Sequence, residues 1–125
     1  MDENELSNLV IGAAIEVHRA LGPGLLESVY HTCLLKELHI RGLWVESETP
    51  ITVKYKGDVI TEAYRVDLLV NNKLVIELKA VDKLTAVHRA QLLTYLRLMD
   101  KRLGLLINFN ELVVVKGIKR VINSY

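Results

Sequence analysis

Two acids and a lysine lie on consecutive segments that alternate apolar and polar side chains. Asp67 belongs to the first segment, Glu77 and Lys79 belong to the second, and Asn71-Asn72 separates the two. This alternation predicts a pair of antiparallel strands joined as a hairpin. In the pairing that the apolar residues favour, Asp67 lies directly across from Glu77, at about 5 Å between the Cβ atoms. Two carboxylates this close repel each other unless they share a proton or hold a cation.

The register of this hairpin follows from its apolar residues. Only one register puts both apolar sets on the same face, and a slip by one residue would place Ile76 beside the charged side chains. The pairs that it predicts are Val66 with Leu78, Leu68 with Ile76, and Val70 with Leu74. Asn71-Asn72 alone would suit a two-residue turn, whereas this register requires a three-residue loop or a bulge. We expect the longer connection, because bulges are common beside active sites.

A divalent cation would relieve the repulsion between the two acids. Carboxylate oxygens with an open coordination position suit Mg²⁺ or Mn²⁺. Such a cation lowers the pKa of a bound water and offsets charge at a phosphorus atom. Lys79 could position or help to deprotonate that water, or stabilise a developing oxyanion. The sequence Glu77-Leu78-Lys79 is by itself also typical of an ordinary surface strand, so the interpretation depends on residues elsewhere in the chain.

Polar residues on two predicted helices could complete such a site. Gln91 and Tyr95 are four residues apart and therefore share one helix face. Gly24, Glu27 and Tyr30 recur every third residue, which places Glu27 in the first turn of its helix. A helix dipole favours an acid there whatever its role, so a structural and a functional reading are about equally good.

The elements that must position these residues follow from the periods of the apolar residues. Gly22-Pro23-Gly24 separates two predicted helices, and Thr85 could cap a third. The expected helices cover 5–21, 26–41 and 85–100, and the expected strands cover 51–55, 59–70, 74–79, 103–108 and 112–116. The order ααβββαββ predicts an α/β fold with a mixed central sheet flanked by helices.

Composition narrows the class of protein further. The chain has 125 residues, half of them hydrophobic, so we expect residues 1–125 to form a single domain. A net charge of +1 excludes a protein that coats nucleic acid with an overall basic surface, but it does not exclude a local basic patch. The single cysteine, Cys33, excludes a disulfide framework, and we expect it in the core. The acidic first residues and the lack of a long apolar run predict a cytoplasmic protein without a membrane span.

The four histidines show no metal-ligand spacing among themselves. They are His18, His31, His39 and His88. We expect a structural role for His18, near the turn at Gly22. His88 precedes Gln91 by three residues and could face the same way, toward the site.

Taken together, these residues resemble the GxxExxY protein family, a branch of the PD-(D/E)XK nuclease superfamily. The naming motif is Gly24-Leu25-Leu26-Glu27-Ser28-Val29-Tyr30, and Asp67 with Glu77-Leu78-Lys79 matches the acidic core of the superfamily. Gln91-Leu92-Leu93-Thr94-Tyr95 is similar to the Gln-x-x-x-Tyr motif of RecB-like nucleases. Val66 occupies the place of the proline in the superfamily motif.

The resemblance implies a restriction-endonuclease-like core and assigns roles to single residues. Asp67, Glu77 and the backbone carbonyl of Leu78 would hold Mg²⁺ or Mn²⁺, with Glu27 completing the ligand set. Lys79 would serve the attacking water. Gln91 and Tyr95 would steady the site or the substrate backbone.

The implied function is metal-dependent hydrolysis of phosphodiester bonds in DNA or RNA. Lys83 and Arg89 belong to the local basic residues that could meet phosphates. A domain of this size has a limited surface for contact with nucleic acid, so a homodimer or a partner protein could supply further contacts. The alternative is a non-catalytic module that binds nucleic acid or protein on a nuclease-like scaffold; we rank it second, because all the catalytic-type residues are present together.

Overall fold

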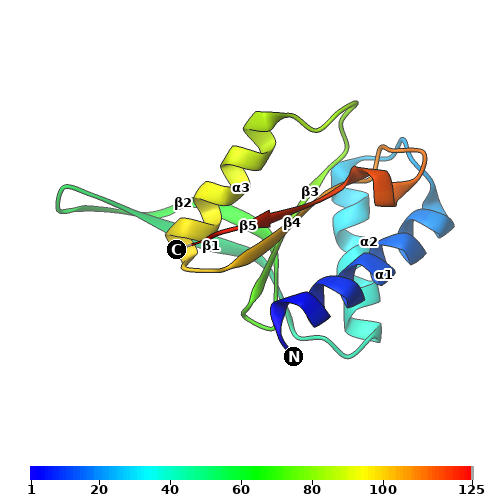
Figure 1. Cartoon of the computed structure of the whole chain (residues 1–125), viewed down its shortest axis with the longest axis horizontal. Helices are drawn as coiled ribbons and strands as arrows, with labels where there is room; N and C mark the ends of the chain where they lie inside the picture. Colours follow the sequence, from blue (N-terminus) through cyan, green and yellow to red (C-terminus); the bar gives the residue numbers. More distant parts are fainter. Residues whose placement is uncertain (125) are drawn as a thin grey trace.

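Residues 1–124, which the computed structural model describes, form a mixed sheet with helices on both faces (Figure 1). The elements in chain order are α1 (Glu3–Leu21), α2 (Glu27–Ile40), β1 (Val45–Tyr55), β2 (Asp58–Val70), β3 (Leu74–Lys79), α3 (Ala86–Met99), β4 (Leu103–Asn108), the 3₁₀ helix η1 (Val114–Gly117) and β5 (Ile118–Ile122). The predicted order ααβββαββ and the α/β class are confirmed.

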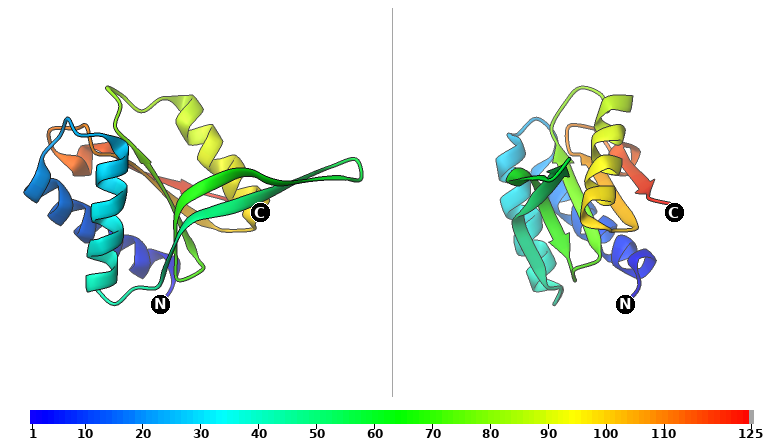
Figure 2. Two further views of the ribbon diagram at one scale, coloured as in Figure 1. Left: turned by 180° about the vertical axis from the view of Figure 1, so that it is seen from behind. Right: turned by 90° about the vertical axis from the view of Figure 1, so that its left-hand side faces the viewer.

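The strands lie in the sheet in the order of the chain, β1-β2-β3-β4-β5. β3 and β4 are parallel, because the crossover through α3 returns the chain to the same end, and the other neighbours are antiparallel. α1 and α2 cover one face and α3 covers the other (Figure 2). Each face has its own core cluster, one lined by Leu34 and Leu38 of α2 and the other by Leu92 and Leu96 of α3.

The last strand differs from the prediction. Residues 112–116 do not form a strand: Leu112 is 85% exposed, and Val114 begins the 3₁₀ helix η1 with its side chain buried. The chain approaches β4 so closely here that a Cβ atom on Gly117 would lie 2.6 Å from the carbonyl oxygen of Asn108. Only after this glycine does the chain become extended, as β5.

The hairpin register is confirmed next to its turn and wrong farther along. Leu68 lies opposite Ile76 and Val70 opposite Leu74, which leaves the expected three-residue loop. Val66, however, packs in the core cluster on the α3 side, whereas Leu78 packs on the side of α1 and α2. The alternation therefore changes face at Asp67, where regular pairing of β2 with β3 stops.

The far halves of β1 and β2 leave the sheet as a two-stranded ribbon that projects away from the helices (Figure 1). Tyr55, Val59 and Ile60 near its tip are exposed. Among the described residues, no helix is long and apolar enough to cross a membrane.

Candidate metal and active site

The two strand acids occupy a fork where β2 and β3 separate. The backbone N–H of Asp67 donates to Oε1 of Glu77 at 2.9 Å, and the backbone N–H of Leu78 donates to Oδ2 of Asp67 at 2.7 Å. Carboxylate oxygens thus take the places that backbone carbonyls hold in a regular ladder. Both amides are satisfied, as buried backbone groups must be, and the strands stay open.

Burial makes a fully ionised fork costly. The side chain of Glu77 is 6% exposed, and burial, followed by the charge of Asp67, raises the pKa of Glu77 from 4.5 to about 8. Burial also raises the pKa of Asp67, although the hydrogen bond from Leu78 acts in the opposite direction. Two carboxylates with raised pKa and oxygen-only donors make a set that fits a divalent cation such as Mg²⁺ or Mn²⁺.

Glu27, in the first turn of α2, is exposed and lies close enough to Asp67 for their charges to interact. Burial, followed by the charge of Asp67, raises the pKa of the Glu27 carboxyl, and the charge of Lys79 acts to lower it. The other motif residues hold the turn before the helix. Gly24 has a φ of 92°, which favours glycine, and the hydroxyl of Tyr30 donates to the carbonyl oxygen of Gly22 at 2.6 Å. Tyr30 also stacks on Phe109 with the ring centroids 4.6 Å apart.

Tyr95 approaches the fork from α3. Its ring is 6% exposed and lies 5.5 Å from the ring of Tyr64, centroid to centroid. Burial, followed by the charge of Glu77, raises the pKa of the Tyr95 hydroxyl. Gln91 lies one turn earlier on the same helix, and its side chain is exposed.

The remaining predicted residues lie at the start of α3 or before it. Lys83 and Arg89 are exposed. Nδ1 of His88 accepts from the backbone N–H of Thr85 at 3.0 Å, so His88 helps to cap α3. The described contacts of His88 thus belong to the helix start, and none of them reaches the acids of the fork.

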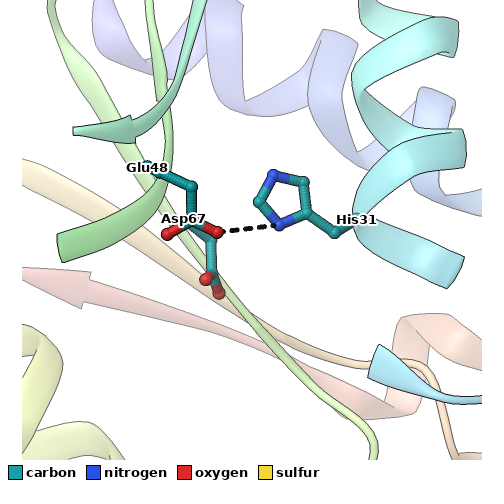
Figure 3. Close-up of side chains that lie close together, drawn as sticks. All are labelled: His31, Glu48 and Asp67. Atoms are coloured by element: carbon teal, nitrogen blue, oxygen red, sulfur yellow. Dashed lines mark ion pairs between the residues drawn. The ribbon is translucent and has the colours of Figure 1, made fainter. Parts of the chain in front are cut away.

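Two further residues, which the sequence analysis did not select, adjoin Asp67. His31 of α2, Glu48 of β1 and Asp67 each offer a ligand atom, and these atoms lie within 4.8 Å of one another (Figure 3). Nδ1 of His31 is 3.6 Å from Oε1 of Glu48. His31 follows Glu27 by four residues and so shares its helix face, a signal that was present in the sequence. Glu48 lies outside the predicted strand 51–55, because β1 begins at Val45, and it meets Asp67 only through the pairing of β1 with β2.

A buried asparagine fixes the chain that follows Lys79. Nδ2 of Asn108 donates to the carbonyl oxygen of Val81 at 2.8 Å, and Oδ1 accepts from the N–H of Val81 at 3.0 Å. The N–H of Phe109 donates to the carbonyl oxygen of Lys79 at 2.9 Å. Lys79 therefore lies at the end of β3, and hydrogen bonds from Asn108 and Phe109 fix the backbone at this end of the strand.

Comparison with known proteins agrees with this arrangement. A family model described as the PD-(D/E)XK nuclease superfamily matches residues 4–121, and the chain belongs to that superfamily. The crystal structure of SSO0001 matches with a TM-score of 0.61 and 24% sequence identity over 98% of this chain, which shows a common fold. This chain spans 60% of the length of that protein. No curated protein compared with the chain matches it.

Proposed function

We propose that the chain is a nuclease that hydrolyses phosphodiester bonds of DNA or RNA with the help of Mg²⁺ or Mn²⁺. The observation that carries the proposal is the fork at which the carboxylates of Asp67 and Glu77 replace the backbone ladder. Lys79 follows Glu77 by two residues, and membership of the superfamily supports the same class of reaction.

Four groups of the chain would hold the cation: the carboxylates of Glu27, Asp67 and Glu77 and the backbone carbonyl of Leu78. All four donate oxygen, which these ions prefer. When bound, the ion supplies a water of lowered pKa and offsets charge at the phosphorus atom. Burial, followed by the charge of Asp67, raises the pKa of Glu27 and Glu77, and such an ion would offset the cost of holding these acids ionised together.

Lys79 is proposed to act on the attacking water. Its charge lowers the pKa of Glu27, Asp67 and Glu77 alike, so the ammonium group lies within electrostatic reach of all three acids. A lysine ammonium has three donors and no acceptor. In that form Lys79 orients the water by its oxygen and stabilises charge on the phosphate oxygens, and in its neutral form it accepts a proton from the water.

The residues of α3 and the segment before it are proposed to meet the substrate. Tyr95, buried beside Glu77, would support the acid, whereas Gln91, Lys83 and Arg89 are exposed and would contact the sugar-phosphate backbone. We also place the chain in the GxxExxY branch with a RecB-like helix motif. A second copy or a partner protein would extend its small footprint on nucleic acid.

The test is a nuclease assay on purified protein with single- and double-stranded DNA and RNA, linear and circular, in Mg²⁺ or Mn²⁺. We expect cleavage by the wild type and a loss of at least about 100-fold with Asp67→Ala and with Lys79→Ala. Lys36→Ala, an exposed lysine on α2, is the matched control and should retain activity. Equal activity of all four proteins, or none in any of them, would overturn the proposal.

A calorimetric titration with Mn²⁺ distinguishes the metal-binding role of Asp67 from the role of Lys79 toward the attacking water. Asp67→Ala should lose Mn²⁺ binding, whereas Lys79→Ala should retain it, because the lysine does not coordinate the ion. A wild-type protein that binds no Mn²⁺ at a concentration of several millimolar would exclude the metal-dependent mechanism, whatever the outcome of the assays.

A further inference from the structure

We propose that His31, Glu48 and Asp67 form a second cation position beside the one at the fork, selective for divalent transition-metal ions that accept an imidazole nitrogen. The proposal builds on the function proposed above and shares Asp67 with it. Its other two ligands come from α2 and β1, and the donor set contains one nitrogen and two carboxylates (Figure 3). Imidazole suits ions such as Zn²⁺, whereas Mg²⁺ prefers oxygen alone.

One of the three spacings between the ligand atoms is close to that of a tetrahedral site. Zn–N and Zn–O bonds of about 2.1 Å put neighbouring ligand atoms about 3.4 Å apart. Nδ1 of His31 and Oε1 of Glu48 are already 3.6 Å apart. The widest spacing permitted by the cluster, 4.8 Å, exceeds the tetrahedral value by about 1.4 Å. Rotation of the half-exposed Glu48 side chain can bring its carboxylate closer to the other two ligands, whereas the spacing of His31 and Asp67 depends on how α2 packs on β2.

A hydroxyl group on the opposite side of the ring is a partner for the second ring nitrogen of His31. Nε2 of His31 lies 2.8 Å from Oγ of Ser47. With a proton on Nε2 that is donated to Ser47, Nδ1 presents a lone pair toward Glu48 and Asp67. Histidines that bind metals commonly donate their other ring N–H to a nearby acceptor in this way, which fixes the ring and raises its basicity.

The position is open to solvent on the side away from the fork. A cavity of about 320 Å³ is lined by Ser28, His31, Thr32, Leu35, Ser47 and Glu48. An ion and its waters can therefore reach His31 and Glu48 from the solvent.

A protonated His31 paired with Glu48 is the competing explanation of the same contact. In that case both ring nitrogens carry protons, and the imidazole makes an ordinary ion pair at 3.6 Å. The two explanations differ in what Nδ1 does when a transition metal is added, which gives the test a direct readout.

The first experiment records ¹⁵N chemical shifts of the four histidines while Zn²⁺ is added to the wild-type protein. We expect the Nδ1 resonance of His31 to move to the range of a metal-bound nitrogen, with His39, exposed near the end of the same helix, unchanged. Mg²⁺ should leave His31 unshifted. A His31 Nδ1 that stays in place at saturating Zn²⁺ would overturn the proposal.

The second experiment measures stoichiometry by calorimetry with Zn²⁺. The wild type should bind two ions, His31→Gln and Glu48→Gln should each bind one, and His39→Gln should bind two. Glu77→Gln should keep the Zn²⁺ bound by His31 and lose the ion at the fork. Circular dichroism checks that each variant folds. Because His31→Gln and Glu48→Gln test the same position independently, the experiment remains decisive if one of them fails to fold.

The failures of the two proposals are distinguishable. If the wild type binds Mn²⁺ in a manner that depends on Glu77, while His31→Gln and Glu48→Gln change neither the stoichiometry nor the affinity for Zn²⁺, only the second position is excluded. If Zn²⁺ binds through His31 but neither Asp67→Ala nor Lys79→Ala affects nucleic-acid cleavage, the nuclease proposal fails and the proposal of a second cation position is retained.

Discussion

The hydroxyl of Tyr30 donates to the carbonyl oxygen of Gly22 at 2.6 Å and accepts from the N–H of Leu25 at 3.1 Å. One side chain from the first turn of α2 thus closes the Gly-Pro-Gly turn that precedes it. Glu27 lies inside this closed loop, so the direction of its carboxylate depends on a contact that carries no chemistry of its own.

Tyr30→Phe removes both hydrogen bonds and keeps the stacking on Phe109. We expect a loss of about 1–2 kcal/mol in the free energy of unfolding, measured with urea, because the carbonyl of Gly22 and the N–H of Leu25 lose a partner in a partly buried turn. Mn²⁺ affinity should fall as well, since the turn no longer fixes Glu27. Tyr55→Phe, on the exposed ribbon, is the control and should change neither quantity. An unchanged Mn²⁺ affinity in Tyr30→Phe would show that the turn does not position Glu27 for metal binding.

Stability of the metal-free protein should fall as the pH rises through the range that Glu77 spans. Its pKa is raised from 4.5 to about 8, so between these values the folded protein holds a proton that the unfolded chain has released. The free energy of unfolding therefore decreases with pH, by at most about 1.4 kcal/mol per pH unit for this group.

Urea unfolding in EDTA between pH 5 and about pH 8 measures this slope. Glu77→Gln should flatten the slope, because the amide keeps the acceptor for Asp67 and has no charge to bury. Asp58→Asn, on the exposed ribbon, should leave the slope as in the wild type. A wild-type stability that rises with pH over this range would contradict the raised pKa.

Glu48 has a φ of 56°, a left-handed conformation that costs an L-residue about 1–2 kcal/mol. We expect Glu48→Gly to be more stable than Glu48→Gln by about 0.5–1 kcal/mol, because glycine adopts this conformation freely but loses more entropy on folding. Both variants remove the same charge, so loss of the Glu48 charge does not explain a difference between them. At Glu46, in the same strand but without a positive φ, the order should reverse. Equal stabilities at position 48 would show that no strain is stored there.

Asn108→Ala should destabilise the protein by about 2–3 kcal/mol, because the partly buried N–H and carbonyl of Val81 lose their partner. Chemical unfolding measures this loss, and Asn8→Ala, exposed on α1, is the control. Since Asn108 holds the chain after Lys79, nuclease activity should also decrease, with Mn²⁺ binding retained. A fully stable variant would mean that water replaces the amide.

The alternation of apolar residues predicted most of the sheet. Both faces of the sheet are buried, and this burial decides the register near the turn of β2 and β3. It was wrong at Val66 because the carboxylates of Asp67 and Glu77 take over from the backbone there, and the strand changes face. A pattern of apolar residues contains no information about a side chain that replaces a ladder carbonyl.

The strand predicted at 112–116 fails for a different reason. The run Leu112–Val115 is apolar enough for a strand, but it lies where the chain passes over Asn108, and only Val114 of the run reaches the core. The spacing of His31 from Glu27 was a signal in the sequence, but its proximity to Glu48 and Asp67 required three elements to be placed together. Spacing along the chain cannot report a cluster whose members come from α2, β1 and β2.

The parallel pairing of β3 with β4 also sets an order of assembly. β2 and β3 form a local hairpin, so Asp67 and Glu77 can meet as soon as residues up to Lys79 have been synthesised. β4 reaches the other edge of β3 only after α3 has crossed over. A nascent chain that stops before Leu103 therefore exposes to water Glu77, which the finished protein buries. The low dielectric that raises the pKa of Glu77 develops only when the second half of the chain arrives.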